Sequence, residues 1–177
     1  VCFVNGNHEM CVERHQPERY QKFMDDLKNG GVQVLHNETA WFWIDGGKVA
    51  VTGYELPWEY YRRFSRRHPS VVGMERSIGK RKQDAYQILL THNPVFFEEY
   101  TAWGADFTFA GHLHGGFIRL PYFGGVISPQ FQLFPKYDHG LYQMDTSSMV
   151  VGAGMGNHSG LFRINNPTEI VTVRIKR

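Results

Sequence analysis

The sequence has little cysteine, no long hydrophobic run and no excess of one charge, and each shortage excludes a class of protein. Two cysteines among 177 residues cannot form a disulfide framework. No window of about 18 apolar residues occurs, so no segment reads as a transmembrane helix. Nineteen lysines and arginines against 17 aspartates and glutamates leave a net charge of only +2. No nucleic-acid-binding module is therefore evident, and an anionic partner must be recognised locally.

The composition is that of one globular domain with a sizeable core. Hydrophobic residues make up 42% of the chain and aromatic residues 15%. No internal repeat, low-complexity tract or linker occurs, so we predict a single domain over residues 1–177, and a monomer. The opening segment Val1-Cys-Phe-Val4 reads as the middle of a protein. We therefore expect the domain to be truncated at its N-terminus.

The order of elements predicts an α/β protein. Hydrophobic periodicity predicts helices over 17–29, 56–69 and 95–103, and a loop over 70–84. Short apolar runs bounded by Gly and Pro predict strands over residues 1–4, 32–35, 41–44, 48–54, 86–90, 107–110, 117–123, 125–127, 140–144, 148–151 and 170–175. The first half of the chain thus alternates strand and helix, and the second half is almost entirely strand.

The most informative stretch is Thr108-Phe-Ala-Gly-His-Leu-His-Gly-Gly116, an apolar strand that ends in two histidines and two glycines. Side chains alternate across a strand, so His112 and His114 can point to one side of the strand end. Converging imidazoles are typical metal ligands. A His-X-His pair can also be a hydrogen-bonded turn, and the motif by itself leaves both interpretations open.

Polar residues follow two further predicted strands in the same way. Asn7 and His8 come after the strand at 1–4, and His92 comes directly after the strand at 86–90. In open α/β sheets, sites form at the carboxyl ends of the strands. We therefore expect one sheet edge to gather Asn7, His8 and His92 with the two histidines of the 108–116 stretch. The remaining histidines at 15, 36 and 68 are assigned surface or structural roles.

Arginines and aromatics crowd the predicted helix over 56–69. In a helix, Arg62 with Arg66 and Arg63 with Arg67 are i, i+4 pairs and form one cationic stripe. This stripe is either a solvated face or a surface for lipid head groups or an anionic substrate. Peripheral membrane contact through these four arginines is therefore one prediction of the sequence.

Three segments resemble signature blocks of the calcineurin-like metallophosphoesterase superfamily, in the family's order: Gly6-Asn-His-Glu9, Thr91-His-Asn-Pro94 and Gly111-His-Leu-His114. Gly154-Met-Gly-Asn157 and Arg163-Ile-Asn-Asn-Pro-Thr-Glu169 resemble its bacterial, often membrane-associated branch. The resemblance implies an α/β fold, a four-layer α/β/β/α sandwich of two mixed sheets. Residues 1–177 then form the C-terminal part of a single metallophosphoesterase domain, with membrane association expected from the branch.

Residue by residue, the resemblance implies that Asn7, His92 and His112 bind one metal and His114 binds a second. The cofactors are then two divalent ions, Mn²⁺, Fe or Zn²⁺, that activate a hydroxide for in-line attack on phosphorus. His8 is the catalytic residue, stabilising charge or protonating the leaving oxygen. His158 and Arg163 are candidate substrate-binding residues.

The resemblance predicts a metal-dependent phosphohydrolase acting on a phosphomonoester, phosphodiester or pyrophosphate. Its substrate is a phosphorylated small molecule or a lipid-linked compound. The family's first two blocks, Asp-X-His and Gly-Asp, do not occur in these residues, so we expect this chain alone to be poorly active. The alternatives are a catalytically inactive, phosphoesterase-like binding or scaffold module, and a single-metal histidine site of structural role. Phe117 stands where the branch often has Gln.

Overall fold

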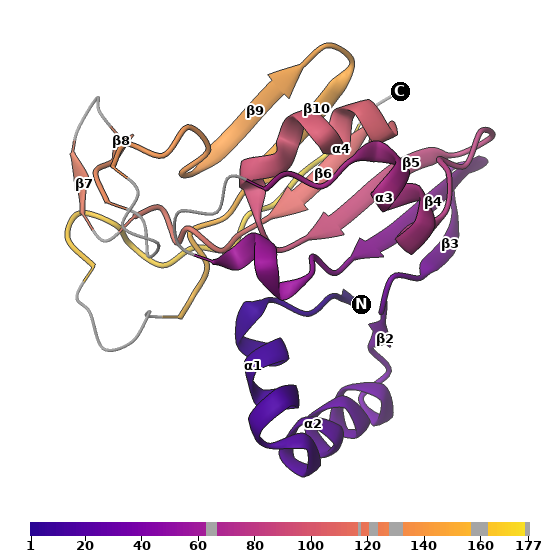
Figure 1. The fold of residues 1–177 in the computed structure, drawn as a ribbon. Helices are drawn as coiled ribbons and strands as arrows, with labels where there is room; N and C mark the ends of the chain where they lie inside the picture. The colour runs from indigo at the N-terminus through magenta and orange to yellow at the C-terminus, as the bar shows by residue number, and fades with distance from the viewer. Residues whose placement is uncertain (63–66, 117, 121–123, 128–132, 157–162, 176–177) are drawn as a thin grey trace.

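A computed structural model describes residues 1–62, 67–116, 118–120, 124–127, 133–156 and 163–175 (Figure 1). Its strands are β1 (Cys2–Phe3), β2 (Gln33–Val34), β3 (Thr39–Ile44), β4 (Gly47–Tyr54), β5 (Tyr86–Thr91), β6 (Phe107–Ala110), β7 (Arg119–Leu120), β8 (Gly124–Gly125), β9 (Gly140–Met144) and β10 (Ser147–Val151). Its helices are α1 (Asn7–His15), α2 (Pro17–Asn29), α3 (Val71–Ile78) and α4 (Phe97–Trp103), with 3-10 turns η1 (Trp58–Tyr61) and η2 (Pro94–Phe96).

A mixed six-stranded sheet is the centre of the fold. Its strand order is β3-β4-β5-β6-β10-β9. The four inner strands run parallel, and the two edge strands β3 and β9 run antiparallel to their neighbours. Parallel strands place their carboxyl ends at one edge, and both the His92 segment and the His112 segment leave the sheet there. The α/β class predicted from the sequence is confirmed.

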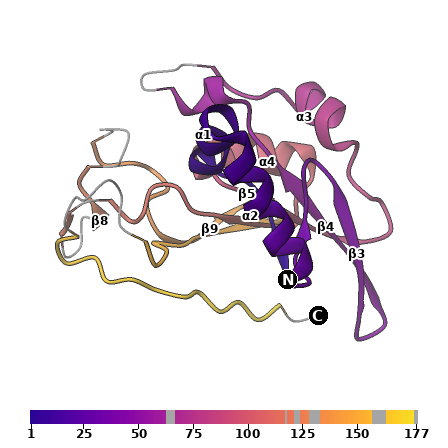
Figure 2. The ribbon, with the colours of Figure 1, turned by 90° about the horizontal axis from the view of Figure 1, so that it is seen from below.

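Helices α3 and α4 cover one face of this sheet. Their buried aromatic and aliphatic side chains pack with the sheet in one cluster: Tyr54, Leu56, Tyr61, Met74, Ile78, Leu89, Phe96, Tyr100, Trp103 and Ala105. Figure 2 shows the C-terminal segment running in extended form on the opposite side of the sheet. A second buried cluster, formed by Phe97, Tyr137, Met149 and Val151, supports the β9–β10 side. The polar residues that follow β5 and β6 are therefore attached to strands that a packed core holds in place.

The N-terminal unit consists of β1, α1, α2 and β2 and lies at one side of the sheet (Figure 1). Its strands form a separate two-stranded parallel sheet, β1-β2. Pro17 occupies the first turn of α2, which ends before Gly30, as the sequence predicted. This unit joins the large sheet closely at Gly53, where an added Cβ would lie 2.4 Å from the carbonyl oxygen of Leu35. Only glycine allows that approach, so Gly53 brings the end of β2 against β4.

Three helix predictions need correction. Asn7–His15 forms α1, which the sequence analysis did not predict because its polar surface gives no apolar stripe. Among the described residues of the predicted helix over 56–69, only the short turn η1 is helical, and Arg62 already has an extended backbone. Arg63 and Arg66 lie outside the described residues. The predicted loop over 70–84 contains α3, whose first turn is capped by the Ser70 hydroxyl accepting from Gly73 N–H at 3.0 Å.

One strand prediction is wrong, and another falls partly outside the described residues. Residues 170–175 are extended but belong to no sheet among the described residues, because no neighbouring strand there supplies a hydrogen-bonding edge. Of the strand predicted over 117–123, the described residues contain β7, which pairs with β8 in a small separate sheet, and residues 121–123 lie outside the described part. Phe117 lies outside the described residues. The remaining predicted strands agree with observed ones to within a few residues.

Candidate metal-binding site

The first part of the site is the beginning of α1. Gly6 is the N-cap, and its N–H donates to the Glu9 carboxylate at 2.9 Å, which holds the first turn closed. A Cβ on Gly6 would lie 2.9 Å from three ring atoms of His92. The close approach of this glycine to the imidazole places Asn7, the first residue of α1, beside the end of β5. His8 follows on the exposed side of the same turn.

His92 is a partly buried member of the site, next to His112, which is 7% exposed. It leaves β5 one residue after Thr91, and Asn93 then begins η2 by accepting from Val95 N–H at 3.1 Å. Burial lowers the pKa of His92 to about 4; Glu9 opposes this shift, and the charges of His114 and His8 add to it. The ring is therefore neutral at physiological pH. These charges also show that His8, Glu9 and His114 lie close to His92.

Two polar atoms of this region lack a hydrogen-bond partner among the described residues although they are buried: Asn7 Oδ1 and His92 Nε2. Asn5 Oδ1, Thr91 Oγ1 and several hydroxyls elsewhere share this condition, and among them Asn7 Oδ1 and His92 Nε2 belong to the predicted ligands. A buried polar atom without a partner is costly, and a bound ion is one way to satisfy it.

The segment after β6 reaches the same point by an unusual backbone path. His112 and His114 have φ values of 65° and 50°, and Gly115 and Gly116 also have positive φ. The strand ends at Ala110, so strand alternation does not place the two histidines, contrary to our reasoning from sequence. The His112 ring instead lies 4.9 Å from the His92 ring between centroids. Non-glycine residues in this backbone region are concentrated at functional sites.

Tyr61 holds the two rings from the η1 side. Its ring centroid lies 5.2 Å from that of His112 and 6.2 Å from that of His92, with the ring edge turned toward His112. Sequence reasoning assigned this tyrosine only to an arginine-rich helix. Its packing gives the pair an apolar wall and limits how far either imidazole can turn.

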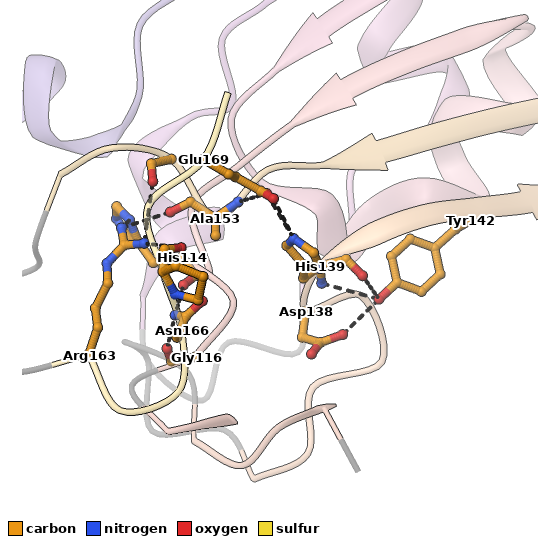
Figure 3. Close-up of polar contacts among 11 residues, drawn as sticks. His114, Gly116, Asp138, His139, Tyr142, Ala153, Arg163, Asn166 and Glu169 are labelled. Carbon is orange, nitrogen blue, oxygen red and sulfur yellow. Dashed lines mark hydrogen bonds and ion pairs between the residues drawn. The ribbon is translucent and has the colours of Figure 1, made fainter. Parts of the chain in front are cut away.

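His114 faces a C-terminal segment that we call the strap, residues 163–169 (Figure 3). The Arg163 guanidinium lies 3.4 Å from His114 Nδ1 and donates to the carbonyl oxygens of Ala153 at 2.8 Å and Gly154 at 3.3 Å, and to that of Gly156. A guanidinium only donates, so its contact with Nδ1 requires an unprotonated nitrogen. The same lone pair is the one a metal would need at that nitrogen.

The rest of the strap is bonded around the same loop. The buried Asn166 amide donates to the carbonyl oxygens of His114 at 2.5 Å and Gly116 at 2.7 Å. The Glu169 carboxylate accepts from Ala153 N–H at 2.7 Å and pairs with His139 Nε2 at 2.8 Å. Burial would raise the pKa of Glu169, but these two donors hold it below its usual value. Sequence resemblance marked this segment, but it did not predict these contacts.

The predicted ligands divide into two groups when tested against a cation. Asn7, His92 and His112 have the donor types that a divalent cation takes, an amide oxygen and imidazole nitrogens, and the His92 and His112 rings lie 4.9 Å apart. His114 lies close by, but Arg163 occupies the neighbourhood of its Nδ1. Across the described part of the chain, no group of three or more His, Cys, Asp or Glu side chains is arranged to hold a metal ion. Both ions and their ligands therefore stay predictions.

The two predicted substrate-binding residues differ in what the structure records. Arg163 is turned toward backbone carbonyls and His114, as described above, and His158 lies outside the described residues.

Arg67 of the predicted cationic stripe pairs with Glu59 at 2.9 Å, and Arg62 is exposed. No helix within the described residues is long and apolar enough to cross a bilayer.

Fold and site together define an α/β protein with an amide- and imidazole-lined site at the carboxyl edge of a largely parallel sheet. Comparison with known proteins names the group. The chain is 30% identical over 102 residues to the uncharacterized metallophosphoesterase YkuE of Bacillus subtilis, covering 58% of this chain and 35% of that protein. It is 22% identical over 167 residues to the uncharacterized metallophosphoesterase YkoQ of the same organism, covering 94% and 57%. The chain is thus similar to proteins named metallophosphoesterases, the superfamily that its three blocks resemble.

A third relative, the uncharacterized protein YpbG of Bacillus subtilis, is 29% identical over 128 residues, covering 70% of this chain and 42% of that protein. The chain thus spans between about a third and somewhat over half of the length of these relatives. No protein-family model matches the sequence, and no solved structure matches it.

Proposed function

We propose that this chain is part of a metal-dependent phosphohydrolase that cleaves a phosphoric ester or anhydride bond. The observation that carries the proposal is the pair of buried atoms without a partner, Asn7 Oδ1 and His92 Nε2, beside the His112 ring. A bound cation would satisfy both atoms at once, whereas a purely structural cluster would leave their desolvation uncompensated. Lewis-acid activation of a phosphoryl group and of the attacking water is the chemistry that divalent cations supply in such sites.

The protein's own groups contribute in three ways. Asn7, His92 and His112 would hold the cation, with His114 as the candidate ligand of a second. Helix α1 begins at Asn7, so its positive end faces the site and favours an anionic phosphate. Tyr61 packs on the rings and shields them from bulk water. The substrate class, a phosphomonoester, phosphodiester or pyrophosphate, follows from the predicted chemistry.

His8 is the proposed general acid. It is exposed in the first turn of α1, directly after Asn7, so it reaches the solvent side from which a substrate enters. When water attacks phosphorus and the bond to the leaving oxygen breaks, that oxygen gains negative charge and takes a proton from the imidazolium. General acids of this kind contribute about 10²–10⁴-fold to the rate.

The four-layer sandwich belongs to the same proposal. The large sheet carries helices on one face, and β1 contributes to a second, two-stranded sheet. Residues at β1, β5 and β6 line an open hollow of about 250 Å³, formed by Cys2, Phe3, Val4, Leu90, Thr91, Phe109 and Ala110. We propose that β1 and β2 belong to the second central sheet of the complete domain. Sequencing the gene upstream of Val1 tests this, with Asp-X-His and Gly-Asp after apolar strands as the expected result.

The activity is tested on the complete gene product with Mn²⁺ and a generic aryl phosphodiester. We expect turnover that His8→Ala lowers by at least about 10²-fold while Mn²⁺ binding is retained. His15→Ala is the matched control, because His15 lies on the same helix and is exposed. Equal turnover of His8→Ala and the unchanged protein would contradict the role of His8, and no turnover in any form would contradict catalysis.

A catalytically inactive binding module is the second candidate. It is favoured by the position of Arg163 at His114 and by the lack, among described residues, of a cluster of three or more His, Cys, Asp or Glu ligands. This candidate predicts that the complete gene product binds phosphate compounds without turnover. Membrane contact is a separate proposal: replacing Arg62, Arg63, Arg66 and Arg67 with Gln should then weaken binding to anionic vesicles.

A further inference from the structure

We infer that the strap, residues 163–169, is a positioning device for the histidine loop over 111–116, with Asn166 as its central positioning residue. The inference rests on the proposed function in one respect, because the loop it positions carries the proposed ligands His112 and His114. It assigns to the C-terminal segment a role in holding the site together.

The loop needs such a device because its backbone is in a costly conformation. Four of its residues, His112, His114, Gly115 and Gly116, have φ between 50° and 82°. Glycine adopts this region freely, but the two histidines do not. Such a conformation persists only where surrounding contacts determine it. Within the loop, Leu113 is fully buried, and Gly116 N–H donates to the Leu113 carbonyl at 2.8 Å.

Asn166 supplies the contact from outside. One side-chain nitrogen donates to two loop carbonyls, those of His114 and Gly116, and thus spans the turn between them. The side chain is 3% exposed, so water does not compete for these carbonyls. The fit is also steric, since a Cβ on Gly115 would lie 2.8 Å from Asn166 Oδ1. The glycine and the asparagine are therefore matched to each other.

Two further strap residues hold the strap itself. Arg163 binds the carbonyls of Ala153, Gly154 and Gly156 after β10 and reaches His114 Nδ1. Glu169 closes the other end on Ala153 N–H and His139 (Figure 3). Both ends of the strap are thus fastened to the turn after β10, and Asn166 lies between them over the histidine loop. The strap thus connects the histidine loop over 111–116 to the turn after β10.

The test compares Asn166→Asp with Asn165→Asp. Both replace an asparagine with a nearly isosteric carboxylate, but Asn166 is buried against two carbonyls and Asn165 is exposed. In Asn166→Asp, the donor is lost and a carboxylate faces two carbonyl oxygens. We measure hydrogen exchange at the Leu113 and Gly116 amides and in β6. We also measure Mn²⁺ affinity from the electron paramagnetic resonance signal of the unbound ion. Outer partners of metal ligands typically contribute about 10–100-fold to affinity.

The expected result for Asn166→Asp is exchange at Leu113 and Gly116 at least about tenfold faster with β6 unchanged, and Mn²⁺ affinity about tenfold lower. Asn165→Asp should behave as the unchanged protein. Unchanged loop exchange, or faster exchange everywhere including β6, would overturn the inference. If His112→Ala leaves Mn²⁺ binding unaltered, the proposed function fails, and the exchange measurement still decides whether the strap holds the loop.

Discussion

The two sides of the candidate site are built in opposite ways. On the side formed by α1 and the end of β5, Asn7 Oδ1 and His92 Nε2 are buried with no partner among the described residues. On the strap side, Arg163, Asn166 and Glu169 each make two or more polar contacts. An unsatisfied buried atom costs stability, whereas a satisfied network adds rigidity. The first side is therefore suited to bind a ligand and the second to hold the loop that completes the site.

The comparison can be broken most directly at His112, where the two sides meet. His112→Ala should lower Mn²⁺ affinity by more than the roughly 10–100-fold typical of outer-shell changes, because it removes a proposed ligand itself. Titration calorimetry with Mn²⁺ measures the effect. His36→Ala is the control, since His36 is partly exposed and pairs with Glu55 at 2.8 Å. If His112→Ala and His36→Ala bound Mn²⁺ with the same affinity, His112 would not be a ligand.

Glycine substitutions sharpen the comparison on the ligand side. Gly6→Ala should displace the His92 ring, since its Cβ would lie 2.9 Å from three ring atoms, and should cost about 1–3 kcal/mol of unfolding free energy. Gly111→Ala is the matched control in the neighbouring block, because no atom lies within 4 Å of its added Cβ. Urea unfolding of both variants measures the difference. A Gly111→Ala variant as unstable as Gly6→Ala would show that local backbone preference matters more than the contact with His92.

Acid should loosen the strap side. The pKa of Glu169 is held below its usual value, so its contribution to stability is fully present above about pH 4.5 and is lost as the pH falls through the lower folded pKa. Hydrogen exchange at Ala153, whose N–H donates to Glu169, should accelerate over this range. In Glu169→Gln the acceleration should be absent. A pH profile shared by both proteins would assign the acid response to other groups.

The smallest effect is expected far from both sides, at the surface ion pair of Arg67 and Glu59. Their side chains are 71% and 46% exposed, so Arg67→Gln should change the unfolding free energy by no more than about 1 kcal/mol. Thermal unfolding at low and high salt measures it. A larger loss would indicate that the segment before α3 holds Tyr61, and through it the histidine pair, in place.

The limits of prediction from sequence follow from particular residues. The apolar runs of β4, β5 and β6 and the stripe of α2 are local patterns, and each was predicted correctly. Helix α1 was missed because its sequence is polar, and α3 was missed because its signal is an exposed serine cap rather than a long stripe. The strand predicted at 170–175 has a strand's local pattern, but a strand also needs a neighbour to pair with.

By itself, the sequence determined which residue types follow the strands: Asn7, His92 and the two histidines after β6 lie in blocks that resemble the superfamily. The tertiary structure alone decided how these residues are held. The left-handed backbone at His112 and His114, the Tyr61 ring against the histidine pair and the Asn166 contacts all join segments far apart in the chain. Local sequence encodes residue type and periodicity, but the direction of a side chain in a loop depends on contacts that exist only after the chain has folded.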